Sequence, residues 1–299
     1  MNILITGGSG FVGSTLAKDL LAEGHQVSAT GTSPQHKTVR HQNFRYIQAD
    51  TTREGIWQDE IKNVDGVVNL AGRSIFGRWT DRYKKQIYDS RILTTRNVVD
   101  ALSGGKGSFL CSASAVGYYG DRGDDIVTEA DPAGNGFLAE VGQDWEKEAF
   151  RAEEHNIRVM AMRFGIILGK GGGAIEKMVP AFRMYVGGPL GDGAQWFPWV
   201  HLSDITKAIR FLIDNEHLEG IFNFCSPNPV RNRDLAKTMG SILRVPAIMP
   251  APKIMVRLFM GEMASALFDS HRVNPERLLA NGFKFQYPDL DRAIQQIVQ

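Results

Sequence analysis

The sequence has little cysteine and no pattern of metal ligands. Only two of its 299 residues are cysteine, Cys111 and Cys225, and neither stands at metal-ligand spacing. Both lie in apolar, strand-like segments, so we expect buried thiols rather than a disulfide. Free thiols are typical of a reducing cytoplasm.

The sequence also lacks an excess of charge and a long apolar run. Its formal net charge is +1, which gives no electrostatic reason to expect nucleic acid or an anionic membrane as a partner. No apolar run approaches the roughly 18 residues that a membrane-spanning helix needs. The first strand begins at once, which leaves no room for a signal peptide. We therefore expect a cytoplasmic protein with neither partner.

What remains is the composition of an ordinary globular protein. Hydrophobic residues make up 43% of the chain and charged residues 22%. With 299 residues the chain can bury a large core and form one domain or two.

The most informative stretch is the first thirteen residues. Ile3 to Ile5 read as a buried strand, and a glycine-rich turn follows with Gly7, Gly10 and Gly13. An apolar helical pattern begins at Phe11. Strand, glycine turn and helix in this order are typical of a dinucleotide-binding site, where the diphosphate lies on the free N–H groups of the helix. A glycine-rich turn without a ligand is the alternative.

Strands and helices alternate along most of the chain. Strands are expected at 26–30, 45–48, 64–70, 109–112 and 158–164, with helices at 80–103 and 137–154 between them. This alternation predicts an α/β fold, a doubly wound parallel Rossmann sheet with a smaller, mostly helical C-terminal lobe. We place the Rossmann domain at 1–226, with an insertion of the substrate lobe near 169–198, and the C-terminal substrate lobe at 227–299.

The end of the second strand lacks an acid. An NAD site usually offers Asp or Glu there to the ribose hydroxyls, but this chain has Gly31, Thr32 and Ser33. Nothing there repels a 2′-phosphate, and Lys37 or Arg40 could add positive charge. We therefore favour NADP over NAD as the cofactor.

Three further positions are candidates for the cofactor site. Asp50, after the third strand, could accept from the adenine amino group or form a turn. Leu70, Ala71 and Gly72 end the fourth strand and are small enough for the cofactor ribose to approach. Arg91, in the helix 80–103, is either a solvated charge or a phosphate partner. That helix could also mediate a homodimer.

Three motifs carry a family resemblance: Thr6–Gly13, Asn69–Gly72 and Ser112–Gly120. They resemble the extended short-chain dehydrogenase/reductases, which include nucleotide-sugar epimerases and dehydratases. The chain is more similar to an atypical branch of uncharacterised epimerase-like proteins, sometimes labelled cell-division inhibitors, through later motifs such as Arg163–Gly169 and Gly187–Gly193. The resemblance implies a Rossmann domain, an NADP-type cofactor and a substrate lobe. The cofactor contacts it implies are Gly7, Gly10, Phe11, Val12, Gly13, Gly31, Thr32, Leu70, Ala71, Arg91 and Ile167.

The catalytic Tyr-x-x-x-Lys pair of the wider superfamily is absent, because none of the seven tyrosines has Lys four residues later. Leu138 and Gly142 occupy the expected Tyr and Lys places. Ser114 stands where the superfamily has its substrate-orienting hydroxyl, and Tyr118 could supply a phenol. We take Ser114 and Tyr118 as the candidate catalytic residues.

Several other side chains are open to two interpretations. His201 is a base or a histidine bonded to backbone at a strand end. Arg163 anchors an anionic substrate or caps its strand. Trp79, Trp196, Phe197 and Trp199 form an aromatic wall or a core between the lobes.

Two functions are consistent with this sequence. The first is an NADP-dependent oxidoreductase or epimerase-like enzyme acting on a small polar substrate, such as a nucleotide-sugar or carbonyl compound. The second is a non-catalytic NADP(H)-binding module that senses redox state.

Overall fold

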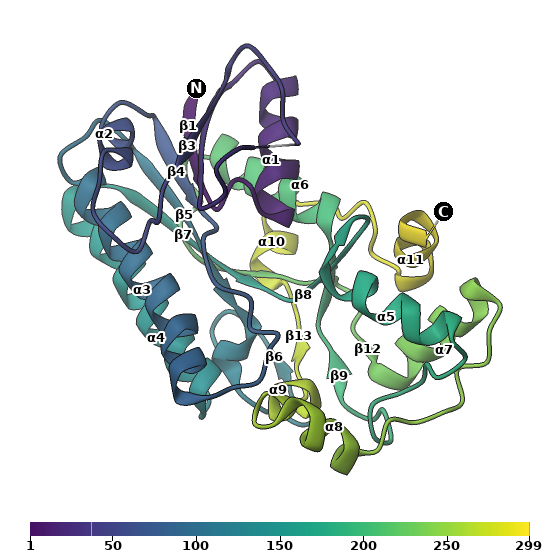
Figure 1. Ribbon diagram of the computed structural model, residues 1–299. Helices are drawn as coiled ribbons and strands as arrows, with labels where there is room; N and C mark the ends of the chain where they lie inside the picture. Colours follow the sequence, from purple (N-terminus) through teal and green to yellow (C-terminus); the bar gives the residue numbers. More distant parts are fainter. Residues whose placement is uncertain (37, 299) are drawn as a thin grey trace.

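A parallel sheet of seven strands forms the centre of the molecule in the computed structural model, which describes residues 1–36 and 38–298 (Figure 1). Its order is β3-β2-β1-β4-β5-β7-β11, so the strand order reverses beside β1. Ligands of such sheets bind outside the carboxyl ends of the strands at this reversal. The strands are β1 (Asn2–Thr6), β2 (Gln26–Gly31), β3 (Phe44–Gln48), β4 (Gly66–Asn69), β5 (Phe109–Ala115), β7 (Arg158–Phe164) and β11 (Gly220–Phe224).

Helices cover both faces of this sheet because the strands are apolar on both sides. On one face, Leu16, Ile209 and Leu278 belong to the same core cluster as Ile3 and Ile5. They come from α1 (Phe11–Ala22), α6 (Leu202–Asp214) and α10 (Glu276–Ala280). The other face is covered by α2 (Trp57–Ile61), α3 (Asp81–Leu102) and α4 (Phe137–Phe150), which is followed by the 3-10 helix η2 (Arg151–His155). The predicted Rossmann sheet is confirmed.

A smaller lobe with its own core lies beside the sheet. Leu168, Trp199, Leu235 and Ile294 share one buried cluster. The lobe contains β8 (Ile166–Gly169), α5 (Gly173–Arg183), β10 (Trp199–His201), α7 (Asn232–Leu243) and α11 (Leu290–Val298). The boundary placed at residue 226 stays a prediction, because segments on both sides of it contribute to both cores.

Short elements join the two parts. β9 (Trp196–Phe197) pairs antiparallel with β12 (Val230–Arg231), and β6 (Ile126–Val127) pairs with β13 (Arg272–Val273). The 3-10 helix η1 (Val116–Tyr119) follows β5, and α8 (Lys253–Met260) and α9 (Met263–Phe268) lie at the lower end of the molecule in Figure 1.

One expected helix boundary is wrong by a few residues. The helix expected to run to residue 154 is α-helical only to Phe150, and continues as η2 until the left-handed Asn156 ends it. Both cysteines are free and buried, as expected.

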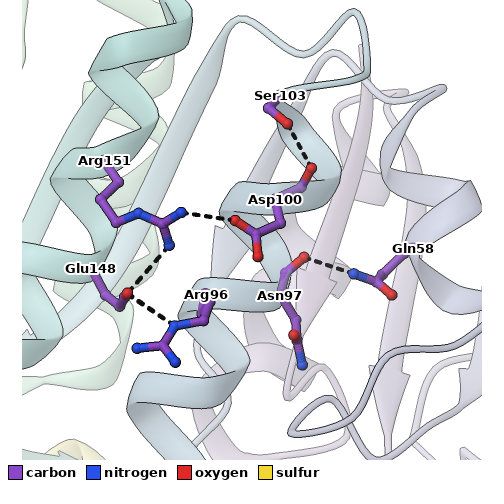
Figure 2. A network of polar contacts seen from close by, with 7 residues as sticks. All are labelled: Gln58, Arg96, Asn97, Asp100, Ser103, Glu148 and Arg151. Carbon is purple, nitrogen blue, oxygen red and sulfur yellow. Dashed lines mark hydrogen bonds and ion pairs between the residues drawn. The ribbon is translucent and has the colours of Figure 1, made fainter.

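Ion pairs between side chains hold α3 against α4 (Figure 2). Glu148 of α4 accepts from Arg96 of α3 at 3.1 Å and from Arg151 at 3.2 Å, and Arg151 also pairs with Asp100 at 3.1 Å. Because α4 also carries Glu146 and Gly142, this network positions one wall of the site described next. No helix in the described part of the chain is both long and apolar enough to cross a bilayer.

Candidate functional site

The turn after β1 is shaped to admit a ligand close to its backbone. Gly7 has a φ of 66°, a conformation that favours glycine. A Cβ on Gly13 would lie 2.5 Å from the Gly7 carbonyl oxygen, so only glycine lets α1 start this close to the turn. Gly10 caps α1 without any side-chain hydrogen bond. The first N–H groups of the helix are therefore available to an anion.

His36, in the loop after β2, forms a hydrogen bond to this turn. Its Nδ1 accepts from the backbone N–H of Thr38 at 3.3 Å and of Val39 at 3.2 Å. The proton is therefore on Nε2, which donates to the Gly8 carbonyl at 3.1 Å. This side chain was not singled out from the sequence, where it reads as one polar loop residue among several.

A cavity opens between the glycine turn and the loop after β2. Its volume is about 550 Å³, and it is lined by Ser9, Ser33, Pro34, Gln35, His36 and Thr38. Gly31 lies against Ser9, and Thr32 is exposed next to it. The lining carries hydroxyl groups and no carboxylate. Arg40 is exposed on this loop, and Lys37 lies outside the described residues.

The carboxyl end of β4 is fixed against the turn. Thr6 donates to Asn69 at 2.6 Å, and its Oγ1 accepts from the backbone N–H of Leu70 and Ala71 at 3.2 and 3.3 Å. A Cβ on Gly7 would lie 2.9 Å from the Ala71 Cα, so Leu70 and Ala71 line the turn directly. The sequence motif contained Thr6 and Asn69, but their shared bond depends on the pairing of β1 with β4.

Arg91 reaches the same edge from α3. Its guanidinium lies near Gly72, donates to the Arg73 and Ile87 carbonyls at 3.0 Å each, and stands 5.1 Å from the centre of the Trp145 ring. No carboxylate among the described residues pairs with it. Burial lowers the pKa of Arg91 to about 10. A cation without a counter-charge is suited to bind a phosphate.

Phe11 and Ile167 meet through a glycine-rich segment. A Cβ on Gly172 would lie 2.5 Å from the Phe11 ring, so the segment 169–173 packs directly on the start of α1. Ile167 lies in β8 immediately before this segment, opposite Val200 of β10. This contact brings the smaller lobe to the edge of the glycine turn, where Val12 also packs against the core.

Asp50 is engaged in its own turn. Its Oδ1 accepts from the Thr52 hydroxyl at 2.7 Å and from the Thr52 N–H at 3.1 Å. The structure thus shows the turn-forming reading, while the contact with adenine stays a prediction.

Ser114 belongs to a buried polar network. Its hydroxyl donates to Glu146 at 2.6 Å, and Arg163 forms two hydrogen bonds of 2.7 Å to the same carboxylate. Arg163 also donates to the Tyr119 hydroxyl at 2.9 Å, which in turn donates to Asn223. Glu146 raises the pKa of Arg163 against the effect of burial, and burial raises that of Tyr119. The Ser114 hydroxyl already donates its proton to Glu146, so it can only accept a hydrogen bond from a substrate.

Tyr118 lies against the same arginine. The Arg163 guanidinium carbon is 3.5 Å from the centre of its ring, a close cation–π contact. Tyr118 is half-buried, and no described residue hydrogen-bonds its hydroxyl. Ser114 and Tyr118 are thus brought together by Arg163, which lies beside Ser114 in the pairing of β5 with β7 and is itself a buried member of the network. Its role as an anchor for an anionic substrate stays a prediction.

Other side chains occupy the positions expected for the Tyr and Lys of the Tyr-x-x-x-Lys pair. Leu138 packs on Gly117, and a Cβ on Gly142 would lie 3.2 Å from the Tyr118 Cβ. The volume beside Gly142 is thus taken by Tyr118. Glu146, one helical turn further along α4, is a site residue that was not singled out from the sequence.

The remaining candidates have structural partners. His201 accepts from the Ser203 N–H at 3.2 Å, so it caps α6, and burial lowers its pKa. The aromatic residues do not gather into one wall. Trp199 lies in the core of the smaller lobe, Trp79 packs with Phe137, and Trp196 bonds Asp124.

Sheet order, glycine turn and hydroxyl-lined cavity together define a Rossmann protein of the dinucleotide-binding type. The family model described as "NAD dependent epimerase/dehydratase family" matches residues 3–225, and a "Domain of unknown function (DUF1731)" matches residues 251–297. The chain therefore belongs to the NAD dependent epimerase/dehydratase family, in the atypical branch that its motifs resemble.

Full-length relatives support this assignment. The chain is 36% identical over 305 residues to an epimerase family protein SDR39U1 homolog, chloroplastic, of Arabidopsis thaliana, covering 100% of this chain and 87% of the relative. It is 35% identical over 302 residues to the epimerase family protein YfhF of Bacillus subtilis, covering 100% and 98%. The crystal structure of human epimerase family protein SDR39U1 with NADPH superposes with a TM-score of 0.88 at 29% identity, covering 99% of both chains.

Proposed function

We propose that this protein binds NADP(H) and transfers hydride between it and a small polar carbonyl or hydroxyl compound, with nucleotide-sugars as the first class to test. The observation that carries the proposal is the glycine turn joined to a cavity lined by hydroxyl groups without a carboxylate. The NADPH in the structure of the human relative supports the same choice of cofactor.

The residues present fit such a cofactor. The uncapped N–H groups of α1 suit a diphosphate, and Gly13 lets α1 start close enough to the turn to present them there. Ser9, Ser33 and Thr38 can donate to a 2′-phosphate, and Arg91 can neutralise a phosphate at the end of β4. A bound nicotinamide would supply or accept the hydride.

Tyr118 is the residue of this site best placed to move the accompanying proton. Its hydroxyl has no partner among the described residues, and Arg163 holds a positive charge against its ring. Ser114 would orient the substrate by accepting a hydrogen bond, since its own proton is bound by Glu146. A cleft that excludes water would strengthen both contacts.

Cofactor choice is tested by thermal unfolding with NADPH and NADH. We expect NADPH to raise the melting temperature more, because binding to the folded state stabilises it by mass action. In Ser33→Asp the new carboxylate should repel the 2′-phosphate and remove this preference. Ser241→Asp, on the exposed surface of α7, is the matched control. No response to either dinucleotide in the native protein refutes the proposal.

Turnover is tested by oxidation of bound NADPH against carbonyl compounds and keto-sugar nucleotides. Tyr118→Phe should abolish the oxidation while the NADPH-induced rise in melting temperature persists. Tyr185→Phe, at an exposed tyrosine, should change neither. Full activity in Tyr118→Phe would place the proton transfer elsewhere.

A second function, NADP(H) binding without turnover, is favoured by two observations. Leu138 and Gly142 fill the places of the superfamily pair, and the Ser114 proton is bound by Glu146. This function predicts a strong response to NADPH in thermal unfolding and no oxidation by any substrate class. It then remains to find the protein that distinguishes the NADP⁺-bound from the NADPH-bound state.

A further inference from the structure

Exposed apolar side chains are concentrated at one end of the molecule. Of the fourteen large hydrophobic residues exposed in the described part of the chain, nine lie in two short segments, three in 184–186 and six in 248–259. Soluble proteins usually scatter such residues singly, and a contiguous group marks a surface that meets another apolar phase.

The two segments form one surface. Leu190 and Ala251 form a β-bridge, and the backbone N–H of Gly191 donates to the Ala251 carbonyl at 2.9 Å. The N–H of Ala251 donates to the Pro189 carbonyl at 2.9 Å. The chain after α5 is therefore tied to the chain that leads into α8.

α8 presents its apolar side outward. Ile254, Met255, Leu258 and Phe259 occupy one side of the helix, and Ile254, Leu258 and Phe259 are 80%, 74% and 74% exposed. The opposite side holds the buried Val256 and Met260, which packs against Trp79 and Met263. In Figure 1, α8 lies at the lower edge of the molecule, while the N-terminus lies near the top.

The charges around this surface are mainly positive. The neighbouring acids are Asp192, whose pKa is lowered by its own turn and by Lys253, and Glu262, which pairs with Lys84. Segments 183–191 and 244–261 contain Arg183, Arg244, Lys253 and Arg257 and no Asp or Glu. None of these four cations forms an ion pair with another described residue. Lys253 and Arg257 lie beside the apolar side of α8, where long side chains can reach a polar boundary while the helix lies below it.

We propose that this end of the protein binds the surface of an anionic lipid bilayer, with α8 lying in the interface and the side chains of Ile254, Leu258 and Phe259 inserted. An outward apolar helix side flanked by Lys and Arg is the pattern of an interfacial helix. A second copy of this chain fits less well, because docking the apolar sides of two α8 helices face to face brings Lys253 and Arg257 of both copies together.

The net charge of the whole chain does not show where its cations lie, so this surface could not be predicted from it. The net charge of +1 sums these cations with the acids of the whole chain, so composition alone indicated no anionic membrane. The proposal concerns binding at the surface and is compatible with the lack of a spanning helix among the described residues.

The test is co-sedimentation of the full chain with vesicles. We expect binding to vesicles of phosphatidylcholine mixed with phosphatidylserine, weak binding to pure phosphatidylcholine, and release by salt. The double variant Leu258→Ser/Phe259→Ser should bind at least about tenfold more weakly than the native protein. Arg257→Gln should bind about fivefold more weakly, the effect of one charge near an anionic surface.

Ile56→Ser is the control, since Ile56 is 85% exposed on the main domain and outside the patch. Thermal unfolding shows whether each variant is folded. Native-like binding by the folded double variant, or no binding to anionic vesicles, overturns the proposal. A concentration-dependent dimer that the double variant abolishes, without vesicle binding, would assign the surface to a second copy. None of these outcomes depends on the cofactor, so failure here is distinct from failure of the proposed function.

Discussion

The buried ion pair between Glu146 and Arg163 can be tested by removing one charge at a time. Arg163 exposes 1% of its side chain and Glu146 7%, and two hydrogen bonds of 2.7 Å join them. In Glu146→Gln the guanidinium stays buried without its counter-charge. Removing one partner of such a pair typically costs about 3–5 kcal/mol, and we expect about 3 kcal/mol because Gln can retain one hydrogen bond.

The assay is urea denaturation followed by tryptophan fluorescence, with the free energy of unfolding as the readout. Glu148→Gln is the matched control on the same helix. Its arginine partners are 48% and 40% exposed, so solvent screens the pair and the loss should be about 1 kcal/mol or less.

A double-mutant cycle separates the pair from its surroundings. Arg163→Met removes the cation while keeping most of the volume, so Glu146→Gln/Arg163→Met should be more stable than the sum of the single losses predicts. The reasoning is refuted if Glu146→Gln costs no more than Glu148→Gln, or if the two substitutions are additive.

Three further predictions concern the turn, Arg91 and acid stability. Gly13→Ala should abolish the NADPH-induced rise in melting temperature and lower the free energy of unfolding by about 1–3 kcal/mol through overpacking. Gly104→Ala, where a Cβ meets nothing within 4 Å, should keep both the NADPH response and the native stability. Arg91→Met should leave the unfolding free energy of the ligand-free protein within about 1 kcal/mol and weaken NADPH binding, measured by isothermal titration; unchanged binding contradicts a phosphate contact. Burial lowers the pKa of His271 to about 4 from 6.5, so the folded state binds fewer protons and loses stability as the pH falls through this window. At pH 5 this loss is about 2 kcal/mol relative to pH 7, and thermal unfolding of His271→Asn should show it reduced.

Much of the fold could be predicted because its signals are local. The strand from Ile3 to Ile5 and the turn with Gly7 and Gly13 depend on neighbouring residues, and so does the helix capped by Thr80, whose hydroxyl accepts from the Tyr83 N–H. The α-helix boundary at Phe150 was missed because apolar periodicity continues past it into η2.

The candidate site also contains residues that local patterns predict and residues whose role depends on distant partners. The cofactor-side residues Gly7, Leu70 and Ala71 meet because parallel strands end at one edge, which the alternating pattern already implies. The role of Glu146 could not be predicted, because its partners Ser114 and Arg163 are 32 and 17 residues away in sequence. The same holds for His36, whose contact with Gly8 spans 28 residues.

The sequence by itself determined the doubly wound fold, the glycine turn and the absence of the Tyr-x-x-x-Lys pair, because periodicity, turn chemistry and residue identity are properties of short stretches. Only the tertiary structure decided that Arg163 is buried against Glu146 and stacked on Tyr118, and that Arg91 has no counter-charge in the described chain. It also decided that the apolar side of α8 faces outward beside unpaired cations. These features depend on which distant segments pack together, and packing sets the burial and the partners of every charge.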